Sequence, residues 1–317
     1  MNSAPSWAEK LLPLNIDFNQ KSLANQVILA IMAYAAGDAL GVQYEFIKDK
    51  PLITSLSIQP KEGWPFGGVS DDTLLSLITI STIEEENPEL AAQLFLDRLR
   101  AAIPELRGLG PTTRAALGLR VSDAELAQVG NTNGAMMRTA LCGMAFSSSE
   151  ATKRNTWIFH SAAATHKNQN AIYCAVLLSG IVSELADSNG VKNLEIYQLA
   201  LNVANNIENL PSELASALQT FESWTPSESG ISLDPIDTLL GVLWVIQRAN
   251  SFDEVYKKAC QIGGDTDTVA ALSAAIYAVK AGKLEQFLSM HWLRDIKWDE
   301  VGNLTKYVEI FQKKRGI

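Results

Sequence analysis

The chain has 317 residues, of which 47% are hydrophobic and 19% charged, a composition typical of a globular protein with a large core. The net charge of −9 and the lack of a Lys/Arg cluster argue against a nucleic-acid partner. The three cysteines, Cys142, Cys174 and Cys260, show no CxxC or Cys/His spacing, so we expect neither a zinc site nor a disulfide framework.

The N-terminal region carries no pattern of a secretion signal or membrane span. Residues 1–7 lack a charged segment followed by an apolar one. Residues 27–36, the longest apolar stretch near this end, are too few to cross a bilayer and run into Asp38. We therefore expect a soluble cytoplasmic protein with no membrane partner.

Long apolar runs in chain order predict buried helices, and they cover residues 24–40, 74–83, 135–146, 171–185, 236–246 and 269–279. Amphipathic segments between them predict an outer helical layer, at residues 88–103, 194–207 and 299–314. Only residues 52–58 alternate loosely like a strand, and no βαβ rhythm is present. The pattern predicts an all-α protein with a single compact multi-helix domain at 24–317 and an N-terminal extension at 1–23.

Two acidic clusters stand directly before apolar runs. The first acidic cluster is Gly67-Gly68-Val69-Ser70-Asp71-Asp72-Thr73, and the second is Gly263-Gly264-Asp265-Thr266-Asp267-Thr268. Helix capping explains one such cluster, because Ser, Thr and Asp favour helix starts. A cap needs one oxygen, however, and adjacent carboxylates repel each other unless a cation lies between them. Two such clusters favour a site for Mg²⁺ or Mn²⁺, and if the two helix starts converge they predict two ions about 3.5–4 Å apart.

Three further segments carry polar residues in places where chemistry is plausible. Asp38 lies in an apolar helix, where a buried carboxylate needs a partner, and Glu45 follows it in a turn. The loop before residue 135 is small, polar and rich in glycine, which suits a phosphate cradle or an ordinary turn. His166 follows Thr165, and a lone histidine is more often structural than catalytic.

Together these segments resemble the ADP-ribosylglycohydrolase family, which includes the dinitrogenase-reductase-activating glycohydrolases. The matching motifs occur in family order over about residues 24–290, and they are Gly37-Asp38-Ala39-Leu40-Gly41 with Glu45-Phe46, Ser70-Asp71-Asp72-Thr73, Gly110-Pro111-Thr112-Thr113, Asn133-Gly134-Ala135-Met136-Met137-Arg138, Thr165-His166 and Gly263-Gly264-Asp265-Thr266-Asp267-Thr268. One departure is Ser70, where the family usually has Thr, although its hydroxyl can still coordinate a metal.

The resemblance implies an all-α fold around a central cleft with two Mg²⁺ or Mn²⁺ ions. It implies metal ligation by Ser70, Asp71, Asp72, Asp265, Asp267 and Thr268, with Asp267 bridging the ions. It implies catalytic roles for Glu45, Asp72 and Asp265, and contacts to ADP-ribose from Asn133, Gly134, Ala135 and His166. The implied reaction is removal of ADP-ribose from a modified protein side chain, with arginine as the leading acceptor.

Two other functions remain open at this stage. An immunity protein on the same scaffold would neutralise an ADP-ribosyltransferase toxin, and the N-terminal extension is the feature that suggests it. An isoprenoid synthase would also use acidic clusters, but Asp71-Asp72-Thr73-Leu74-Leu75 lacks the third Asp of the motif typical of those enzymes. The extension itself contains Trp7, Leu11 and Leu12, which predict a strap on its own domain or an arm that docks a partner.

Overall fold

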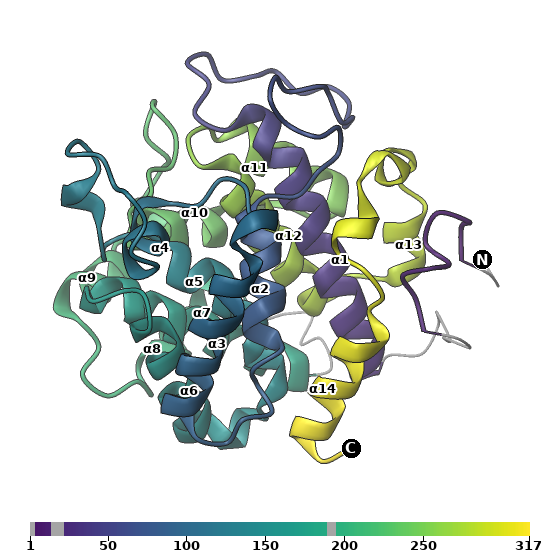
Figure 1. Ribbon diagram of the computed structural model, residues 1–317. Coiled ribbons are helices and arrows are strands. Elements are labelled where there is room, and N and C mark those ends of the chain that lie inside the picture. The colour runs from purple at the N-terminus through teal and green to yellow at the C-terminus, as the bar shows by residue number, and fades with distance from the viewer. Residues whose placement is uncertain (1–3, 14–21, 189–194) are drawn as a thin grey trace.

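The computed structural model describes residues 4–13, 22–188 and 195–317. The regular secondary structure of these residues is helical, with loops between the helices (Figure 1). The α-helices are α1 (Leu23–Gly41), α2 (Asp71–Ile80), α3 (Pro88–Ala102), α4 (Pro111–Ala116), α5 (Gly134–Thr139), α6 (Ala151–Ala163), α7 (Gln169–Asp187), α8 (Ile196–Ala204), α9 (Ser212–Gln219), α10 (Pro235–Arg248), α11 (Phe252–Gln261), α12 (Thr266–Ala281), α13 (Leu284–Leu288) and α14 (Thr305–Arg315). The 3₁₀ turns are η1 (Val42–Tyr44), η2 (Ile103–Glu105), η3 (Leu126–Gln128), η4 (Ala140–Ala145), η5 (Ser148–Glu150), η6 (Phe221–Ser223), η7 (His291–Asp295) and η8 (Trp298–Glu300). Within the described ranges β-pairing is limited to one isolated bridge, between Ile231 and Gly264. The all-α prediction is confirmed.

The centre of the molecule is the pair α1 and α12, which pack along each other (Figure 1). Both helices are apolar on every face and almost wholly buried, as expected for helices surrounded by others. Two glycines of α1 permit the close approach. A Cβ at Gly37 would lie 2.4 Å from the carbonyl oxygen of Ala270, and one at Gly41 would lie 2.4 Å from the Cα of Asp267. The end of α1 is thereby held against the start of α12.

Two helical predictions differ from the structure in extent. The apolar run at 135–146 is divided into α5 and η4, because Gly143 packs directly on α7, where a Cβ would lie 2.0 Å from the Ser179 carbonyl oxygen. The amphipathic run at 299–314 becomes a helix only from Thr305, after the 3₁₀ turn η8. The loosely alternating residues 52–58 form no strand; they belong to the long loop between η1 and α2.

Among the described residues, two helices are long and apolar enough to cross a membrane by length and composition alone. One is the segment Leu23–Tyr44, which is longer than the run at 27–36 that the sequence singled out, so the expectation that this region is too short was wrong. The other is Gln169–Asp187. Their most apolar windows are 89% and 72% buried inside the protein, so the core already accounts for their composition.

The described part of the N-terminal extension, residues 4–13, packs on the C-terminal region. The Trp7 ring stacks on the Trp298 ring with centroids 5.4 Å apart, and Leu11 and Leu12 are buried. The backbone N–H of Leu304 donates to the Leu11 carbonyl at 2.8 Å. Such contacts with the chain's own domain are those expected of a strap. Residues 14–21, which also belong to the predicted extension, lie outside the described residues.

Candidate active site

Asp38 fastens the start of α2 to the end of α1. Its carboxylate is fully buried and accepts the backbone N–H of Ser70 at 3.0 Å and of Thr73 at 3.1 Å. It also accepts the Thr73 hydroxyl at 2.5 Å. The partner that a buried carboxylate requires is therefore the helix start that carries the first acidic cluster.

The acidic residues of the first acidic cluster lie in the first turn of α2. Ser70 is the N-cap, and its hydroxyl accepts the backbone N–H of Asp72 at 3.0 Å. Asp71 and Asp72 form the first turn and are buried. The Ser70 hydroxyl and the Asp38 carboxylate thus accept the N–H groups of Asp72 and Thr73, so the helix start does not need the Asp71 or Asp72 carboxylate as its cap. Among the described residues, Oδ2 of Asp72 is buried and has no hydrogen-bond partner.

The second acidic cluster begins α12 through a tight glycine turn. Gly263 and Gly264 have φ of 79° and 77°, a left-handed conformation that glycine adopts without the steric cost of a side chain. A Cβ at Gly264 would lie 1.9 Å from the Ile231 carbonyl oxygen, which accepts the N–H of Asp265 at 2.9 Å. The turn presents Asp265, Asp267 and Thr268 from a buried helix start.

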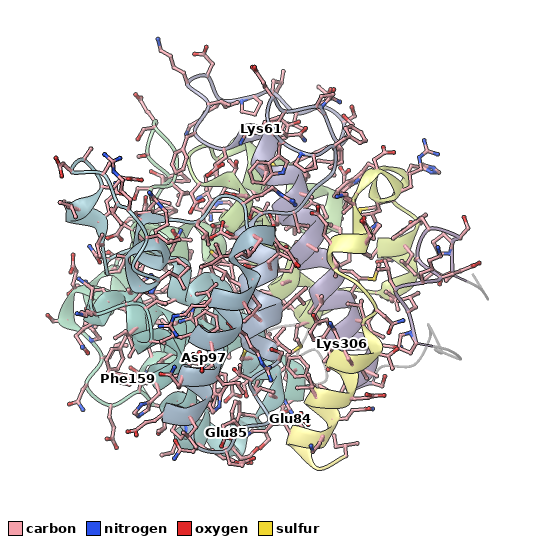
Figure 2. The ribbon with its side chains drawn as sticks, viewed as in Figure 1. Lys61, Glu84, Glu85, Asp97, Phe159 and Lys306 are labelled. Atoms are coloured by element: carbon pink, nitrogen blue, oxygen red, sulfur yellow. The ribbon has the colours of Figure 1, made fainter. Side chains whose placement is uncertain are left out.

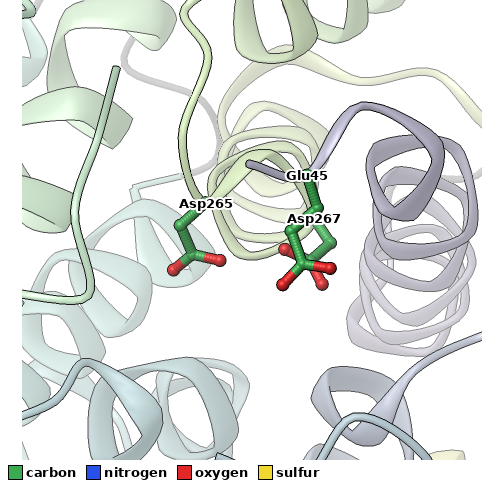
Figure 3. Close-up of side chains that lie close together, drawn as sticks. All are labelled: Glu45, Asp265 and Asp267. Atoms are coloured by element: carbon green, nitrogen blue, oxygen red, sulfur yellow. The ribbon is translucent and has the colours of Figure 1, made fainter. Parts of the chain in front are cut away.

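Glu45 joins the second acidic cluster from the loop after α1. One carboxylate oxygen each of Glu45, Asp265 and Asp267 lies within 4.8 Å of the others, and Figure 3 shows these side chains gathered at the N-terminal end of α12. The N–H of Phe46 donates to the Gly264 carbonyl at 2.8 Å, which fixes Glu45 in place. Lys61 lies on the exposed loop above α1 (Figure 2), and its ammonium is 3.4 Å from the Glu45 carboxylate.

The acidic side chains act on each other electrostatically. Burial and then the charges of Asp38 and neighbouring carboxylates raise the pKa of Asp71 to about 8 and hold that of Asp72 well above its usual value. Asp265 is among the charges that raise the pKa of Asp72, and Asp72 in turn raises the pKa of Asp267. The carboxylates of the two helix starts therefore lie close enough to act on one another.

These residues fit a divalent cation. Carboxylate and hydroxyl oxygens are the donors that Mg²⁺ and Mn²⁺ prefer. The site gathers several buried carboxylates, and in the described part of the chain the ion pair with Lys61 is the only one formed by Glu45 or by the acids of the two clusters. The unpaired oxygen of Asp72 is a further donor without a protein partner among the described residues. A cation would offset both the burial and the mutual repulsion that raise the pKa values of these acids.

The loop that the sequence assigns to the ligand, residues 130–134 before α5 (the ligand loop), lies beside the second acidic cluster. The side-chain amide of Asn133 donates to the carboxylate of Asp265 and to the Thr238 hydroxyl, the latter at 2.8 Å. Gly134 and Ala135 begin α5. The His166 side chain is 1% exposed and packs against this loop. A Cβ on Gly134 would lie 3.4 Å from the His166 ring.

Several residues near the site were not expected from the sequence. Lys61 and Arg107 flank the Trp64 ring, each 5.6 Å from its centroid. Thr112 and Thr132 hydrogen-bond to each other behind the ligand loop at 3.0 Å. The Gly110-Pro111-Thr112-Thr113 motif pointed toward Thr112, whereas no local pattern distinguishes Lys61 or Arg107 from surface residues.

The sequence matches the ADP-ribosylglycohydrolase family over residues 19–316. The chain therefore belongs to this family of glycohydrolases.

The chain is also similar to two uncharacterized proteins and to a solved structure. The chain is 23% identical to the Uncharacterized protein YegU of Escherichia coli, over 79% of this chain and 86% of the relative. It is 24% identical to an uncharacterized protein of Archaeoglobus fulgidus, over 84% of this chain and 90% of the relative. A structure described as an ADP-ribosylglycohydrolase-related protein complex superposes with a TM-score of 0.71 at 21% identity, over 93% of this chain and 99% of that one. This likeness establishes the shared fold.

Proposed function

We propose that this chain is a metal-dependent hydrolase that removes ADP-ribose from an ADP-ribosylated acceptor. The observation that carries the proposal is the meeting of Glu45, Asp265 and Asp267, whose carboxylate oxygens lie within 4.8 Å of one another beside the buried acids of α2. So much like charge in a buried site supports a pair of bound cations rather than a set of helix caps.

The donor atoms divide into two sets. The residues that would hold two Mg²⁺ or Mn²⁺ ions are Ser70, Asp71 and Asp72 for one ion and Asp265 and Thr268 for the other, with Asp267 shared. When bound, such ions polarise the reacting oxygen atoms and lower the pKa of water. Asn133 would keep Asp265 oriented, because its amide donates to that carboxylate.

Glu45 is suited to the proton transfer. Its side chain is 31% exposed, so it can reach both the acidic site and a ligand from solvent. Burial and then the charge of Asp265 raise its pKa, while Lys61 lowers it. In the proposed reaction Glu45 accepts a proton from water, the water oxygen bonds to the anomeric carbon, and the bond to the acceptor breaks. A proton returns to the leaving group from Glu45 or from an acid of the clusters, such as Asp72 or Asp265.

The acceptor we propose is a protein side chain, with arginine as the first choice. Large apolar side chains that are exposed gather on two loops that continue from the site, the loop before α2 and the loop before α5. They are Phe46, Ile47, Leu52, Phe66, Leu119, Leu126 and Val129. Outside these loops the other exposed large apolar residues among those described are Leu90 and Ile317. Exposed apolar side chains on loops that also carry site residues support a macromolecular substrate.

The test is release of ADP-ribose from arginine-, serine- and otherwise ADP-ribosylated substrates, with Mg²⁺ or Mn²⁺ and after chelation. We expect release with metal, its loss after chelation, and loss of both metal and activity in Asp267→Ala. The control is Asp97→Ala, which removes an exposed carboxylate on α3 (Figure 2). Full activity of the chelated, metal-free protein would overturn the metal requirement.

The apolar loops have their own test. The double variant Phe66→Ser/Leu126→Ser should raise KM for an ADP-ribosylated protein by about tenfold, since exposed apolar contacts contribute to docking. It should leave hydrolysis of free ADP-ribosyl-arginine unchanged. Leu90→Ser is the matched control, because Leu90 is 57% exposed, as Leu126 is, but lies on α3. An equal effect on both substrates would contradict a protein acceptor.

The alternative function, an immunity protein that neutralises an ADP-ribosyltransferase toxin, can be tested separately. Its motivation was the N-terminal extension, and residues 4–13 pack on the chain's own domain through Trp7 and Trp298. Capture of an ADP-ribosyltransferase toxin by the catalytically inactive Asp267→Ala variant would support it. A cytoplasmic location is part of the main proposal, and the three free, buried cysteine thiols support it.

A further inference from the structure

Arg138 is a buried cation that is held by neutral groups. Its side chain is 1% exposed on α5, and one guanidinium nitrogen donates to the Ser161 carbonyl at 2.5 Å and to the Thr165 hydroxyl at 3.1 Å. The other donates to the Ser161 hydroxyl at 3.1 Å, and the guanidinium lies 4.0 Å from the centroid of the Phe95 ring. A guanidinium can only donate, so every group it touches must accept.

This requirement sets the direction of the next hydrogen bonds. The Thr165 oxygen accepts from Arg138, and among its partners in the described residues only Nδ1 of His166, 2.8 Å away, can accept the single hydroxyl proton of Thr165. Nδ1 is therefore the acceptor, which leaves the proton of a neutral ring on Nε2. Nε2 lies 3.0 Å from the Thr132 hydroxyl oxygen and donates to it. Burial and Arg138 lower the pKa of His166 to about 3, in agreement with a neutral ring.

The series of hydrogen bonds ends in the backbone of the ligand loop. Thr132, having accepted from His166, donates its own proton to the Thr112 hydroxyl at 3.0 Å. Thr112 accepts the N–H of Gly130 at 3.0 Å. Asn133, the residue after Thr132, has different partners: its backbone N–H donates to the Leu233 carbonyl at 2.9 Å and its side-chain amide donates to Asp265.

We propose that His166 is a positioning residue, which as the neutral tautomer protonated on Nε2 connects Arg138 to Thr132 and so holds loop 130–134 at a fixed distance from the second acidic cluster. It makes no contact with the ligand, because both ring nitrogens are occupied and the side chain is 1% exposed. The consequence for ADP-ribose binding rests on the proposed function, which assigns this loop to the ligand.

The tautomer is tested in the wild-type protein. The chain has three histidines, so the ring-nitrogen NMR signals of His166 can be assigned with the variants His160→Gln and His291→Gln. At about pH 7 we expect His166 to carry its proton on Nε2 and to have a bare Nδ1. A proton on Nδ1, or on both nitrogens, would overturn the proposal.

The positioning role is tested by two substitutions of the same residue. His166→Leu removes the donor to Thr132, whereas His166→Gln restores an N–H near the position of Nε2. In the leucine variant, amide exchange at Gly130 and Asn133 should quicken by about tenfold or more, which is the effect of one lost buried hydrogen bond. The glutamine variant should recover most of the protection. Exchange at the Thr268 amide should not change in either variant.

Ligand binding separates this proposal from the proposed function. In His166→Leu the affinity for ADP-ribose should fall by about tenfold, while Mn²⁺ affinity stays within about twofold, because the metal-binding carboxylates are not touched. Unchanged ADP-ribose affinity in a wild type that binds it, or unchanged loop exchange, would contradict positioning. If the wild type shows the tautomer and the exchange effects but binds no ADP-ribose, the positioning role stands and the proposed function fails.

Discussion

Thr73 donates both its backbone N–H and its hydroxyl to the same oxygen of Asp38, at 3.1 and 2.5 Å. Asp38 belongs to α1 and Thr73 to α2, so one buried carboxylate fixes the start of the helix that carries the first acidic cluster. Three residues along α1, the Gly41 carbonyl accepts the Thr266 hydroxyl at 2.8 Å and fixes the start of α12. The end of α1 thus sets the position of both acidic helix starts.

Thr73→Val should destabilise the protein by about 1–3 kcal/mol, because the buried Asp38 carboxylate loses a charge-assisted hydrogen bond while side-chain volume is kept. Denaturant unfolding with saturating Mn²⁺ measures the loss. Thr139→Val is the control: Thr139 is also buried, on α5, but its hydroxyl donates to the Ala135 carbonyl within the helix. The relationship is contradicted if Thr73→Val costs no more than Thr139→Val.

Stability of the metal-free protein should fall as pH rises. Burial raises the pKa of Asp38 to about 6, and burial together with Asp38 raises that of Asp71 to about 8, both above the unfolded value of about 3.9. Raised folded-state values give a contribution to stability that is complete below about pH 4 and is lost as pH rises through about 6 and then about 8.

Thermal unfolding in EDTA should therefore show unfolding free energy falling by on the order of 1 kcal/mol per pH unit between about pH 5 and 7. Saturating Mg²⁺ or Mn²⁺ should flatten this slope, since a cation favours the ionised carboxylates. Asp71→Asn should reduce the slope without metal and leave the fold intact. A slope that Asp71→Asn does not alter, or stability that rises over this range in EDTA, would contradict the raised pKa values of Asp38 and Asp71.

Gly264→Ala should destabilise the protein by several kcal/mol. The substitution combines a backbone at φ 77° with a Cβ 1.9 Å from the Ile231 carbonyl oxygen. Gly118→Ala separates the two causes, because Gly118 has φ 73° but nothing within 4 Å of its Cβ position. We expect it to cost about 1 kcal/mol, as backbone strain alone does. Equal losses in the two variants would show that the contact with Ile231 contributes nothing.

Trp7→Ala should lower unfolding free energy by about 1–3 kcal/mol, because it removes the stacked pair with Trp298. Hydrolysis should be unaffected in the protein that remains folded. Phe66→Ala is the comparison, since Phe66 is 52% exposed and should change stability by less than about 0.5 kcal/mol. Unchanged stability of Trp7→Ala, together with lost binding to a partner, would favour a docking arm over a strap.

The buried helices could be predicted from sequence because their apolar runs are local and long. The run at 24–40 has the extent of α1 within one or two residues, since a helix that is apolar all round must be shielded from water along its whole length. The run at 135–146 did not predict the division into α5 and η4. That division depends on the contact of Gly143 with the Ser179 carbonyl of α7, a partner that the local sequence does not specify.

The sequence by itself determined the chemistry available to this protein: acidic residues at two helix starts, each after a pair of glycines, because capping and backbone freedom are properties of neighbouring residues. Only the tertiary structure decided which of them meet. Glu45 comes within 4.8 Å of Asp265 and Asp267 because α1 and α12 pack backbone to backbone at Gly41. His166 has threonine hydroxyls at both ring nitrogens because α6 ends behind the ligand loop. Contacts between residues so far apart in the chain depend on how whole helices pack, and no local pattern encodes that packing.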